Sequence, residues 1–414
     1  MKKLMAILLA LALAVSMTAC QSVQAADLMD GIEPNFVEKK PLDGGSAAVA
    51  DFGVRLFQRS FAAGENTLVS PLSVLCALSM TANGAKGETL SQMESVLGLD
   101  VQSLNDWVYS YMAQLSDTES CKLSLANSVW FRDHERLTVE QTFLQTNADY
   151  FGASVYKSPF DDTAVKDINL WVKDHTDGMI DGILEEIPEE AILYLINALA
   201  FDAKWQTEYE KADVRDGLFH ILDGDGTARD VKLMHSTEGQ YLEDGLAAGF
   251  IKYYKGGDYA FVALLPNEDV ALKDYVASLT GEHIQQLISD PEYITVYAAI
   301  PKFEAEYSCE MAQVLKNMGM SDAFDSERAD FSALGTSQWG NISISRVLHK
   351  TYISVDERGT KAAAVTSVEM TDACAAEVIE DYKTVILDRP FLYMLIDTQT
   401  HMPFFIGTVA DVQG

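Results

Sequence analysis

The segment VDERGTKAAAVTSVEMTDACAAEVIEDYKTV, residues 355–385, constrains the fold of this chain more than any other. It begins as a strand, bends at Gly359, and then runs through small apolar residues without a proline or a helix cap. If 360–371 is a strand, its side chains alternate between two faces. Both charged residues, Lys361 and Glu369, fall on one face. The other face is small or apolar throughout and carries Thr360, Ala362, Ala364, Thr366, Val368 and Met370. The pattern fits an exposed loop, a fixed edge strand, or a strand that inserts into a sheet.

The N-terminus has the features of an export signal. Lys2 and Lys3 precede an apolar run at 6–15, which is too short to span a bilayer as a helix. Small residues then lead to Cys20, a pattern typical of bacterial lipoprotein signals. We therefore predict a lipoprotein-type signal peptide at 1–20, with Cys20 acylated. Ordinary cleavage after Ala25 is the alternative. Both readings place the protein outside the cell, as a cell-surface lipoprotein or a secreted protein.

The mature chain is predicted to form one domain. Residues 21–45 mix Asp, Gly, Pro and Ser and are predicted to be a tether with little packing potential. No linker, low-complexity block or internal repeat follows, so 46–414 is assigned to a single large unit with several sheets.

The periodicity predicts the main elements of this domain. Residues 51–62 read as an amphipathic helix. A short strand at 67–69 precedes a helix that is apolar nearly all round, with Ser70 as N-cap and Pro71 at its first position. The remaining predicted strands are 123–131, 192–204, 259–265 and 293–301, all buried, and the C-terminal pair 391–396 and 404–409. Strands and helices do not alternate strictly, which predicts a mixed α/β (α+β) fold with antiparallel sheets.

The charge balance excludes two classes of partner. The formal net charge is −32, and removal of Lys2 and Lys3 with the signal takes it to −34. Nucleic acid and anionic membrane surfaces are therefore excluded as partners, apart from membrane contact through a lipid on Cys20. The remaining cysteines, Cys76, Cys121, Cys309 and Cys374, show no CxxC spacing, and the histidines are scattered. We predict no metal, no cofactor and no disulfide.

Several segments, in order along the chain, resemble the serpins, a family of serine protease inhibitors. VLHKTYISVDERGTKAAAVTSVEM resembles the hinge of their reactive loop. The likeness extends through the following segments, and so covers roughly residues 47–409: NTLVSPLSVLCALSMTANGAKGET, LINALAFDAKWQ, IPKFEAEYSCEMAQVLKNMGMSDAFDSERADFSALG and RPFLYMLIDTQTHMPFFIGTV.

The resemblance implies a serpin fold, with three β-sheets, eight or nine helices and an exposed reactive-centre loop. It also implies the family's mechanism, in which a protease cleaves the loop and the freed arm inserts into the main sheet. The segment 360–371 suits this mechanism, because one of its faces is small or apolar throughout. A dozen inserted residues, each contributing a net hydrogen bond of about 0.5–1.5 kcal/mol, give on the order of 10 kcal/mol. Burial of Val368 and Met370 adds roughly 1.5–3 kcal/mol each.

The resemblance also assigns roles to individual residues. The implied hinge residues are Glu357, Gly359, Thr360, Ala362, Ala363, Ala364 and Thr366. Lys361 departs from the family's usual acidic residue, but by alternation it faces outward. Ser70, Ser73, Asn197 and His349 match positions that hydrogen-bond beneath the opening sheet, and Trp205 matches the region where that sheet opens. These five residues are predicted to assist sheet opening and to have no catalytic role.

The cleaved bond is less sharply defined, because the loop is several residues longer than is typical of the family. Counting seventeen residues from Glu357 places the bond between Ala373 and Cys374, whereas counting back from Pro390 places it near Ile379. Met370 and Ala375 are further alternatives. Small residues surround these sites, and no Arg or Lys lies between Lys361 and Lys383. An elastase-like serine protease is therefore the predicted partner of a monomeric inhibitor.

Two other function classes fit parts of the sequence. Ser154 and Lys157 fit the SxxK pattern of penicillin-binding hydrolases, but no SDN, KTG or GxSxG motif accompanies them. The chain is therefore predicted not to be an enzyme. A serpin-fold binding module, or a plain protease substrate, is the more serious alternative to an inhibitor.

Overall fold

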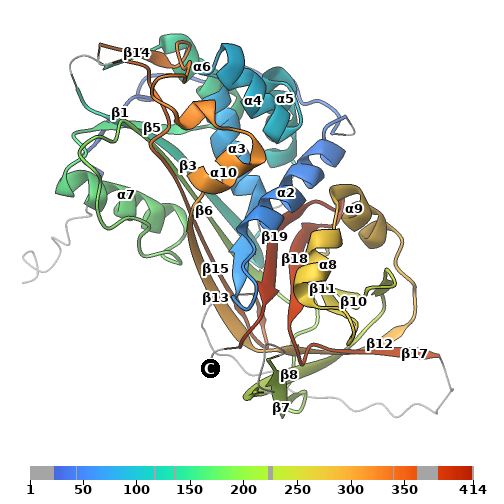
Figure 1. The fold of residues 1–414 in the computed structure, drawn as a ribbon. Helices are drawn as coiled ribbons and strands as arrows, with labels where there is room; N and C mark the ends of the chain where they lie inside the picture. Colours follow the sequence, from blue (N-terminus) through green and yellow to red (C-terminus); the bar gives the residue numbers. More distant parts are fainter. Residues whose placement is uncertain are drawn as a thin grey trace, which may run out of the picture.

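The computed structural model describes residues 23–42, 44–115, 118–134, 137–221, 227–338, 340–360 and 381–412. Within these ranges, nine α-helices surround three large β-sheets, and strands β4 (Leu137–Val139) and β14 (Gly335–Ser337) form a small separate pair (Figure 1). The predicted mixed α/β class is confirmed.

The largest sheet, called sheet A here, has seven strands in the order β1-β5-β3-β6-β16-β15-β13. In that order, their bounds are Ala26–Asp27, Ser154–Ser158, Cys121–Arg132, Leu193–Lys204, Gly359–Thr360, Arg346–Val355 and Phe303–Glu310. Strands β3 and β6 are antiparallel, whereas β6 and β15 run parallel.

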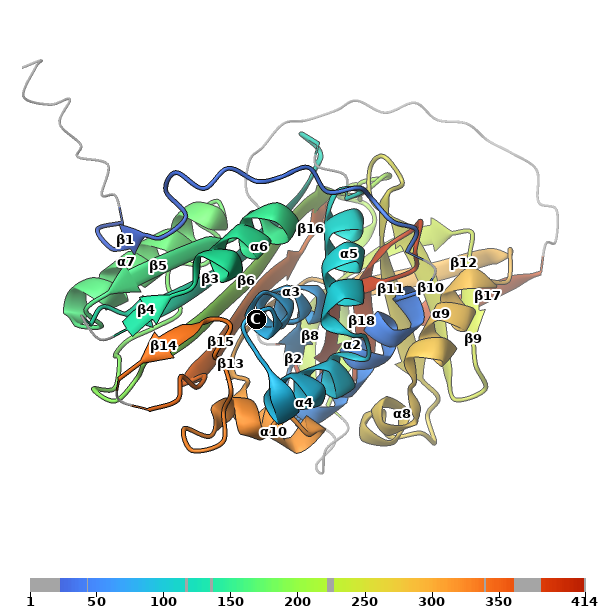
Figure 2. The ribbon, with the colours of Figure 1, turned by 90° about the horizontal axis from the view of Figure 1, so that it is seen from above.

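Two further sheets lie beside sheet A. Sheet B has the order β2-β19-β18-β11-β10-β9, with bounds Thr67–Val69, Pro403–Val409, Phe391–Asp397, Tyr259–Pro266, Ala247–Tyr253 and Tyr241–Glu243. Sheet C has the order β17-β12-β8-β7, with bounds Tyr382–Ile386, Thr295–Pro301, Ala228–Glu238 and Val214–His220. In Figure 2, β12 and β17 lie at the opposite end of the molecule from α7 (Asp162–His175).

The remaining helices are α2 (Ser46–Ser60), α3 (Pro71–Ala82), α4 (Gly87–Leu97), α5 (Val101–Met112), α6 (Gln141–Phe151), α8 (Leu272–Ser278), α9 (Gly281–Ser289) and α10 (Ala312–Met318). Along β6, Leu193, Leu195 and Leu199 belong to the main core between sheets A and B. The alternate residues Tyr194, Ile196 and Ala198 belong to a second core under α7. The central strand β6 is thus buried on both faces, as its continuous apolar sequence requires.

Helix α3 is the central helix of the fold. The Ser70 hydroxyl accepts a hydrogen bond from the Ser73 backbone N–H, and Pro71 occupies the first helical position. All twelve residues of the helix are buried, because it lies between sheets A and B. The predicted cap and the all-round burial are both confirmed.

The prediction for residues 21–45 was wrong in one respect. Within the described range 23–42, the segment packs along the body of the protein. Ala26 and Asp27 pair with Lys157 and Tyr156 as an edge strand of sheet A. The Asp167 carboxylate accepts hydrogen bonds from the backbone N–H groups of residues 24 and 25, at 3.0 and 2.8 Å. The backbone of this segment therefore finds partners far away in sequence, which its composition does not reveal.

The prediction of a buried strand at 293–301 was also only partly right. Strand β12 spans Thr295–Pro301, but the side chains of Tyr293 and Tyr297 are 79% and 49% exposed. Sheet C has one solvent-facing side here, and the aromatic ring of Tyr382 meets that of Tyr297 edge-on.

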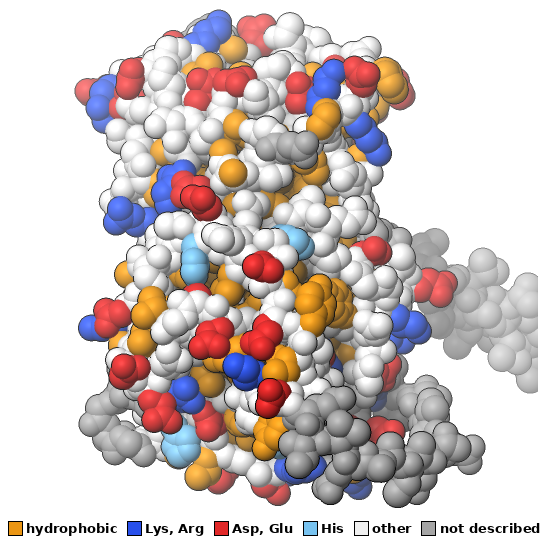
Figure 3. All heavy atoms as spheres, turned by 90° about the vertical axis from the view of Figure 1, so that its right-hand side faces the viewer, with side chains coloured by type: hydrophobic (Ala, Val, Ile, Leu, Met, Phe, Trp, Pro, Cys, Tyr) orange, Lys and Arg blue, Asp and Glu red, His pale blue; other side chains and the backbone are white. Residues whose placement is uncertain are grey.

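On the face of the molecule that carries α8 and α9, acidic, basic and hydrophobic side chains are interspersed (Figure 3).

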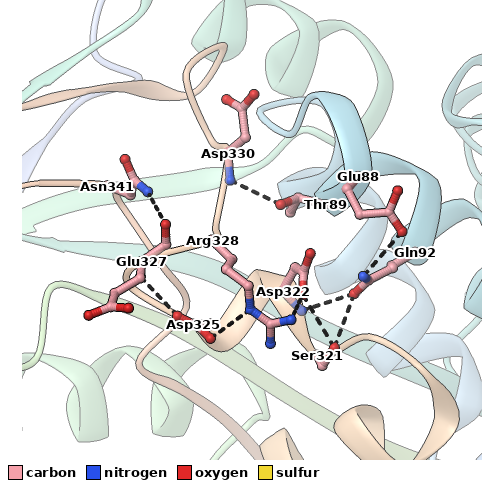
Figure 4. A network of polar contacts seen from close by, with 10 residues as sticks. All are labelled: Glu88, Thr89, Gln92, Ser321, Asp322, Asp325, Glu327, Arg328, Asp330 and Asn341. Atoms are coloured by element: carbon pink, nitrogen blue, oxygen red, sulfur yellow. Dashed lines mark hydrogen bonds and ion pairs between the residues drawn. The ribbon is translucent and has the colours of Figure 1, made fainter.

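A polar network fastens α4 to the segment after α10 (Figure 4). The Arg328 guanidinium pairs with the carboxylates of Asp322, 3.0 Å away, and Asp325, 2.8 Å away. The amide oxygen of Gln92, on α4, accepts a hydrogen bond from the Asp322 backbone N–H. The hydroxyl of Thr89, on the same helix, accepts a hydrogen bond from the Asp330 backbone N–H. This network joins residues that are distant in sequence at one end of the molecule.

The described residues contain neither a membrane-spanning helix nor a grouped metal-ligand set. None of their helices has the length and apolar character needed to cross a bilayer. Among the same residues, no three His, Cys, Asp or Glu side chains are grouped to hold a metal ion. Cys76, Cys121 and Cys309 form no disulfide within this part of the chain.

Candidate functional site at the opening of sheet A

The centre of sheet A is closed along most of its length and separated at one end. Strands β6 and β15 pair directly, residues 194–200 with residues 346–352. Beyond this stretch, β16 lies between them: Gly359 pairs with Lys204, and Thr360 pairs with both Ala203 and Val355. Strand β16 is antiparallel to both neighbours. The first residues of the small-residue segment are therefore already inside the sheet.

Glycine is required at 359 because the chain approaches β6 closely. A Cβ atom built on Gly359 would lie 1.9 Å from the carbonyl oxygen of Ala203 and 2.8 Å from the Cα of Lys204. Both of these are backbone atoms, which cannot move aside as a flexible side chain would. The sequence suggested a bend at this glycine, but the turn lies just before it, at 356–358, and Gly359 itself belongs to strand β16.

Thr360 is fully buried at the next position. Its hydroxyl forms a hydrogen bond with the phenol of Tyr254, with 2.5 Å between the two oxygens. Burial raises the pKa of Tyr254 well above its ordinary value, so the phenol stays neutral. This hydrogen bond ties the start of the segment to the end of strand β10.

The turn that leads into β16 is held by two aromatic residues. The Trp205 indole N–H donates to the Asp356 carbonyl at 2.8 Å, and the Trp205 backbone N–H donates to the Arg358 carbonyl at 2.7 Å. The backbone N–H of Tyr209 donates to the carbonyl of Glu357 at 2.8 Å. Three consecutive carbonyls of the turn are therefore bound.

Glu357 also forms an ion pair with Lys302, whose Nζ lies 2.8 Å from the carboxylate. Burial alone would raise the pKa of Glu357. The hydrogen bond and charge of Lys302, a backbone hydrogen bond and the charge of Arg358 together outweigh burial, so the net pKa is lowered. The hinge is thus fixed by side-chain as well as backbone contacts.

Four of the predicted sheet-opening residues form one buried group below the hinge. The Ser70 backbone N–H donates to Nε2 of His349 at 3.1 Å, so in the neutral ring the proton lies on Nδ1. That Nδ1–H donates to Oδ1 of Asn197 at 2.5 Å, and the Ser73 hydroxyl donates to the same oxygen at 3.2 Å. Burial lowers the pKa of His349 from 6.5 to about 3.

The position of this group matters for the sheet. His349 on β15 and Asn197 on β6 are partners in the strand register, so their side-chain hydrogen bond spans the pair that would have to separate. Ser70 and Ser73 support it from α3. The resemblance also assigned Trp205 to sheet opening. Trp205 lies apart from these four residues, at the hinge.

Residues 47–412 match the family described as "Serpin (serine protease inhibitor)". The chain belongs to the serpin family. The predicted fold, three main sheets with eight or nine helices, is confirmed over the described residues. The part that the hinge and the buried polar group play in sheet opening stays a prediction.

Individual serpins show how far the likeness reaches. The native-state crystal structure of tengpin, a thermophilic serpin, is 47% identical with a TM-score of 0.90, over 94% of this chain and 100% of that one. For the latent state of tengpin the TM-score is 0.80. Intracellular coagulation inhibitor 2 of Tachypleus tridentatus is 29% identical over 88% of this chain and 90% of its own length. Human antithrombin-III is 27% identical over 84% of this chain and 76% of its own length.

Some predicted residues of this serpin lie outside the described ranges. These are Cys20, the hinge residues Ala362, Ala363, Ala364 and Thr366, and the proposed bond at Ala373 and Cys374 with its alternatives Met370 and Ala375. Their roles stay predictions.

The sequence did not predict a role for three residues of the site: Tyr254, Tyr209 and Lys302. Tyr254 is 106 residues from Thr360, and no motif or periodicity connects two positions so far apart. The alternative SxxK motif fails on geometry. Ser154 and Lys157 lie on strand β5, where residues three apart point to opposite faces.

Proposed function

We propose that this serpin inhibits serine proteases by covalent trapping. The protease serine attacks the carbonyl carbon before the cleaved bond, the new amino terminus leaves, and an acyl-enzyme forms. The freed loop arm then enters sheet A between β6 and β15 and carries the protease with it. Distortion of the protease stalls hydrolysis of the ester. The observation that carries this proposal is the placement of Gly359 and Thr360 between β6 and β15.

The strand pairing supports a favourable insertion. Before insertion, β6 and β15 share one parallel interface below the hinge. An arm that continues β16 would replace it with two antiparallel interfaces, one with each neighbour. Antiparallel pairing is slightly more stable per residue, and each net hydrogen bond is worth about 0.5–1.5 kcal/mol. The Asn197–His349 hydrogen bond has to break first and so contributes to the barrier.

For the target, we propose an elastase-like protease that cuts between Ala373 and Cys374. The loop sequence supports this choice because small side chains fit a shallow specificity pocket, and trypsin-like enzymes require Arg or Lys. Met370 and Ala375 are the alternative sites. The relatives named as coagulation inhibitor and antithrombin support inhibition in general and say nothing about this target.

The test is incubation of the full-length protein with pancreatic elastase, chymotrypsin and trypsin, followed by SDS gels. We expect an SDS-stable complex with elastase and a released C-terminal fragment that begins at Cys374 by mass spectrometry. Cleavage without a complex for all three proteases would instead support the binding-module or substrate alternative.

We further propose that the protein is exported, anchored through a lipid on Cys20 in the manner of a bacterial lipoprotein, and monomeric. The signal-like residues 1–20 support the first two points. Expression in a bacterium, followed by membrane fractionation, tests them. The wild-type protein should sediment with membranes, and Cys20→Ala should release it.

A further inference from the structure

An unusual ion pair lies behind the hinge. Lys252, on β10, pairs with Glu238, on β8, with 2.9 Å between Nζ and Oε1. Their side chains are only 4% and 13% exposed. Among the ion pairs of the described residues, no other has both partners less than one-fifth exposed. Ion pairs buried to this degree lose much solvation and are not explained by stability alone.

The Lys252 ammonium also lies against the two aromatic residues that hold the hinge. Nζ is 4.4 Å from the ring centroid of Tyr209 and 5.3 Å from that of Trp205. Both distances fall within the range of cation–π attraction. The Trp205 ring in turn stacks on Tyr254, with centroids 4.5 Å apart and planes 8° from parallel.

These contacts form a continuous path from the ion pair to the loop. Trp205 and Tyr209 donate to the three carbonyls of the turn at 356–358, and Tyr254 bonds to Thr360. Lys252 contacts two of these three rings, while Glu238 fixes the ammonium and also accepts a hydrogen bond from Ser236 at 2.6 Å.

The pair also borders a cavity of about 650 Å³ that opens to solvent. Tyr209, Asp213, Arg215 and Tyr297 line the same cavity. Water therefore reaches this region from one side, so a change of side chain here need not create a closed void in the core.

We propose that Lys252 and Glu238 act as a clamp on the hinge. As positioning residues, they hold the rings of Trp205 and Tyr209 in place and thereby slow the advance of the loop into sheet A. The effect on loop insertion rests on the proposed inhibitory function, whereas the effect on Trp205 does not. Removal of both charges together leaves no uncompensated buried charge, so the double variant Lys252→Met, Glu238→Gln keeps the native fold.

The first experiment measures sheet opening without a protease. A synthetic peptide with the sequence of residues 359–372, GTKAAAVTSVEMTD, is incubated with each protein, and its annealing is followed by native-gel mobility. We expect the double variant to anneal roughly five- to thirtyfold faster than wild type, the size expected from loss of two cation–π contacts. Lys252→Arg keeps a cation over the rings and should restore the wild-type rate.

Lys232→Met is the matched control, because Lys232 forms an exposed ion pair with Asp216 on the same sheet C. It should leave the annealing rate unchanged. A wild-type rate in the double variant, or an equal acceleration in Lys232→Met, would overturn the clamp.

The second experiment distinguishes failure of the clamp from failure of the proposed function. The fluorescence of Trp205 is isolated as the difference between each protein and its Trp205→Phe counterpart. We expect this difference spectrum to change in the double variant and to recover in Lys252→Arg. An unchanged spectrum contradicts the clamp. A further outcome is that the peptide anneals to none of the proteins while the Trp205 spectrum still changes as expected. That result contradicts the proposed strand insertion but supports the contact between Lys252 and Trp205.

Discussion

The hydroxyl of Thr360 and the phenol of Tyr254 lie 2.5 Å apart in a fully buried hydrogen bond. This contact holds the first residues of the reactive loop inside sheet A before any cleavage. Below it, β6 and β15 are closed, and the side chains of Asn197 and His349 bond across them. Gly359 and Thr360 thus lie between β6 and β15 at the point where the proposed insertion would begin.

Thr360→Arg should convert the inhibitor into a substrate. The position is fully buried between β6 and β15, and an arginine there would be an unpaired buried charge, which is strongly unfavourable. We expect the SDS-stable complex with elastase to fall at least about tenfold, a barrier change of roughly 1.4 kcal/mol, with cleaved protein in its place. Thr360→Ser keeps the hydroxyl and serves as control. Undiminished complex in the arginine variant would refute the inward placement of this side chain.

Acid should weaken the native state through His349. The pKa of His349 is about 3 in the folded protein, against 6.5 ordinarily. Below about pH 6.5 the unfolded chain therefore binds a proton at this residue, whereas the native state does not bind it until about pH 3. The free energy of unfolding therefore decreases as the pH falls from 6.5 towards 3. Between pH 7.5 and pH 5 the loss from this group is about 2 kcal/mol.

Urea unfolding of wild type and His349→Gln at both pH values measures this contribution. Glutamine can accept from Ser70 and donate to Asn197 but does not titrate. The difference between the two pH dependences isolates His349 from His235 and His401, whose pKa values burial also lowers. Parallel pH dependences in the two proteins would show that His349 is not the responsible group.

Much of this architecture could be predicted because it depends on local patterns. The cap at Ser70, the buried helix after Pro71 and the C-terminal strand pair each have a signal within a dozen residues. The packing of residues 23–42 could not be predicted, since its hydrogen bonds reach Asp167 and strand β5. The same holds for the bond between Tyr254 and Thr360. Contacts of this kind depend on tertiary placement, which a single sequence does not display.

The cleaved form should be far more stable than the intact protein. Insertion of the arm adds strand pairing worth on the order of 10 kcal/mol, which corresponds to a rise in melting temperature of roughly 10 °C or more for a chain of this length. Protein nicked once in the loop and then purified provides the sample for calorimetry. Intact protein carried through the same steps without protease is the control. Equal melting temperatures would rule out insertion of the arm.

Gly359→Ala should disturb the hinge without touching the loop residues that follow it. The new Cβ would lie 1.9 Å from the Ala203 carbonyl oxygen, so β16 has to leave its place between β6 and β15. We expect a loss of at least about 1 kcal/mol in the free energy of unfolding, as for alanine at a glycine site that cannot accept it. The cleaved, uncomplexed fraction should increase, since insertion no longer starts from a pre-placed hinge.

Gly239→Ala is the matched control, because no atom lies within 4 Å of a Cβ built there. Urea unfolding and SDS gels with elastase measure both effects side by side. The steric argument predicts that the two alanines differ in both measurements. If Gly359→Ala behaved like Gly239→Ala, the close approach of the hinge to β6 would not exist in solution.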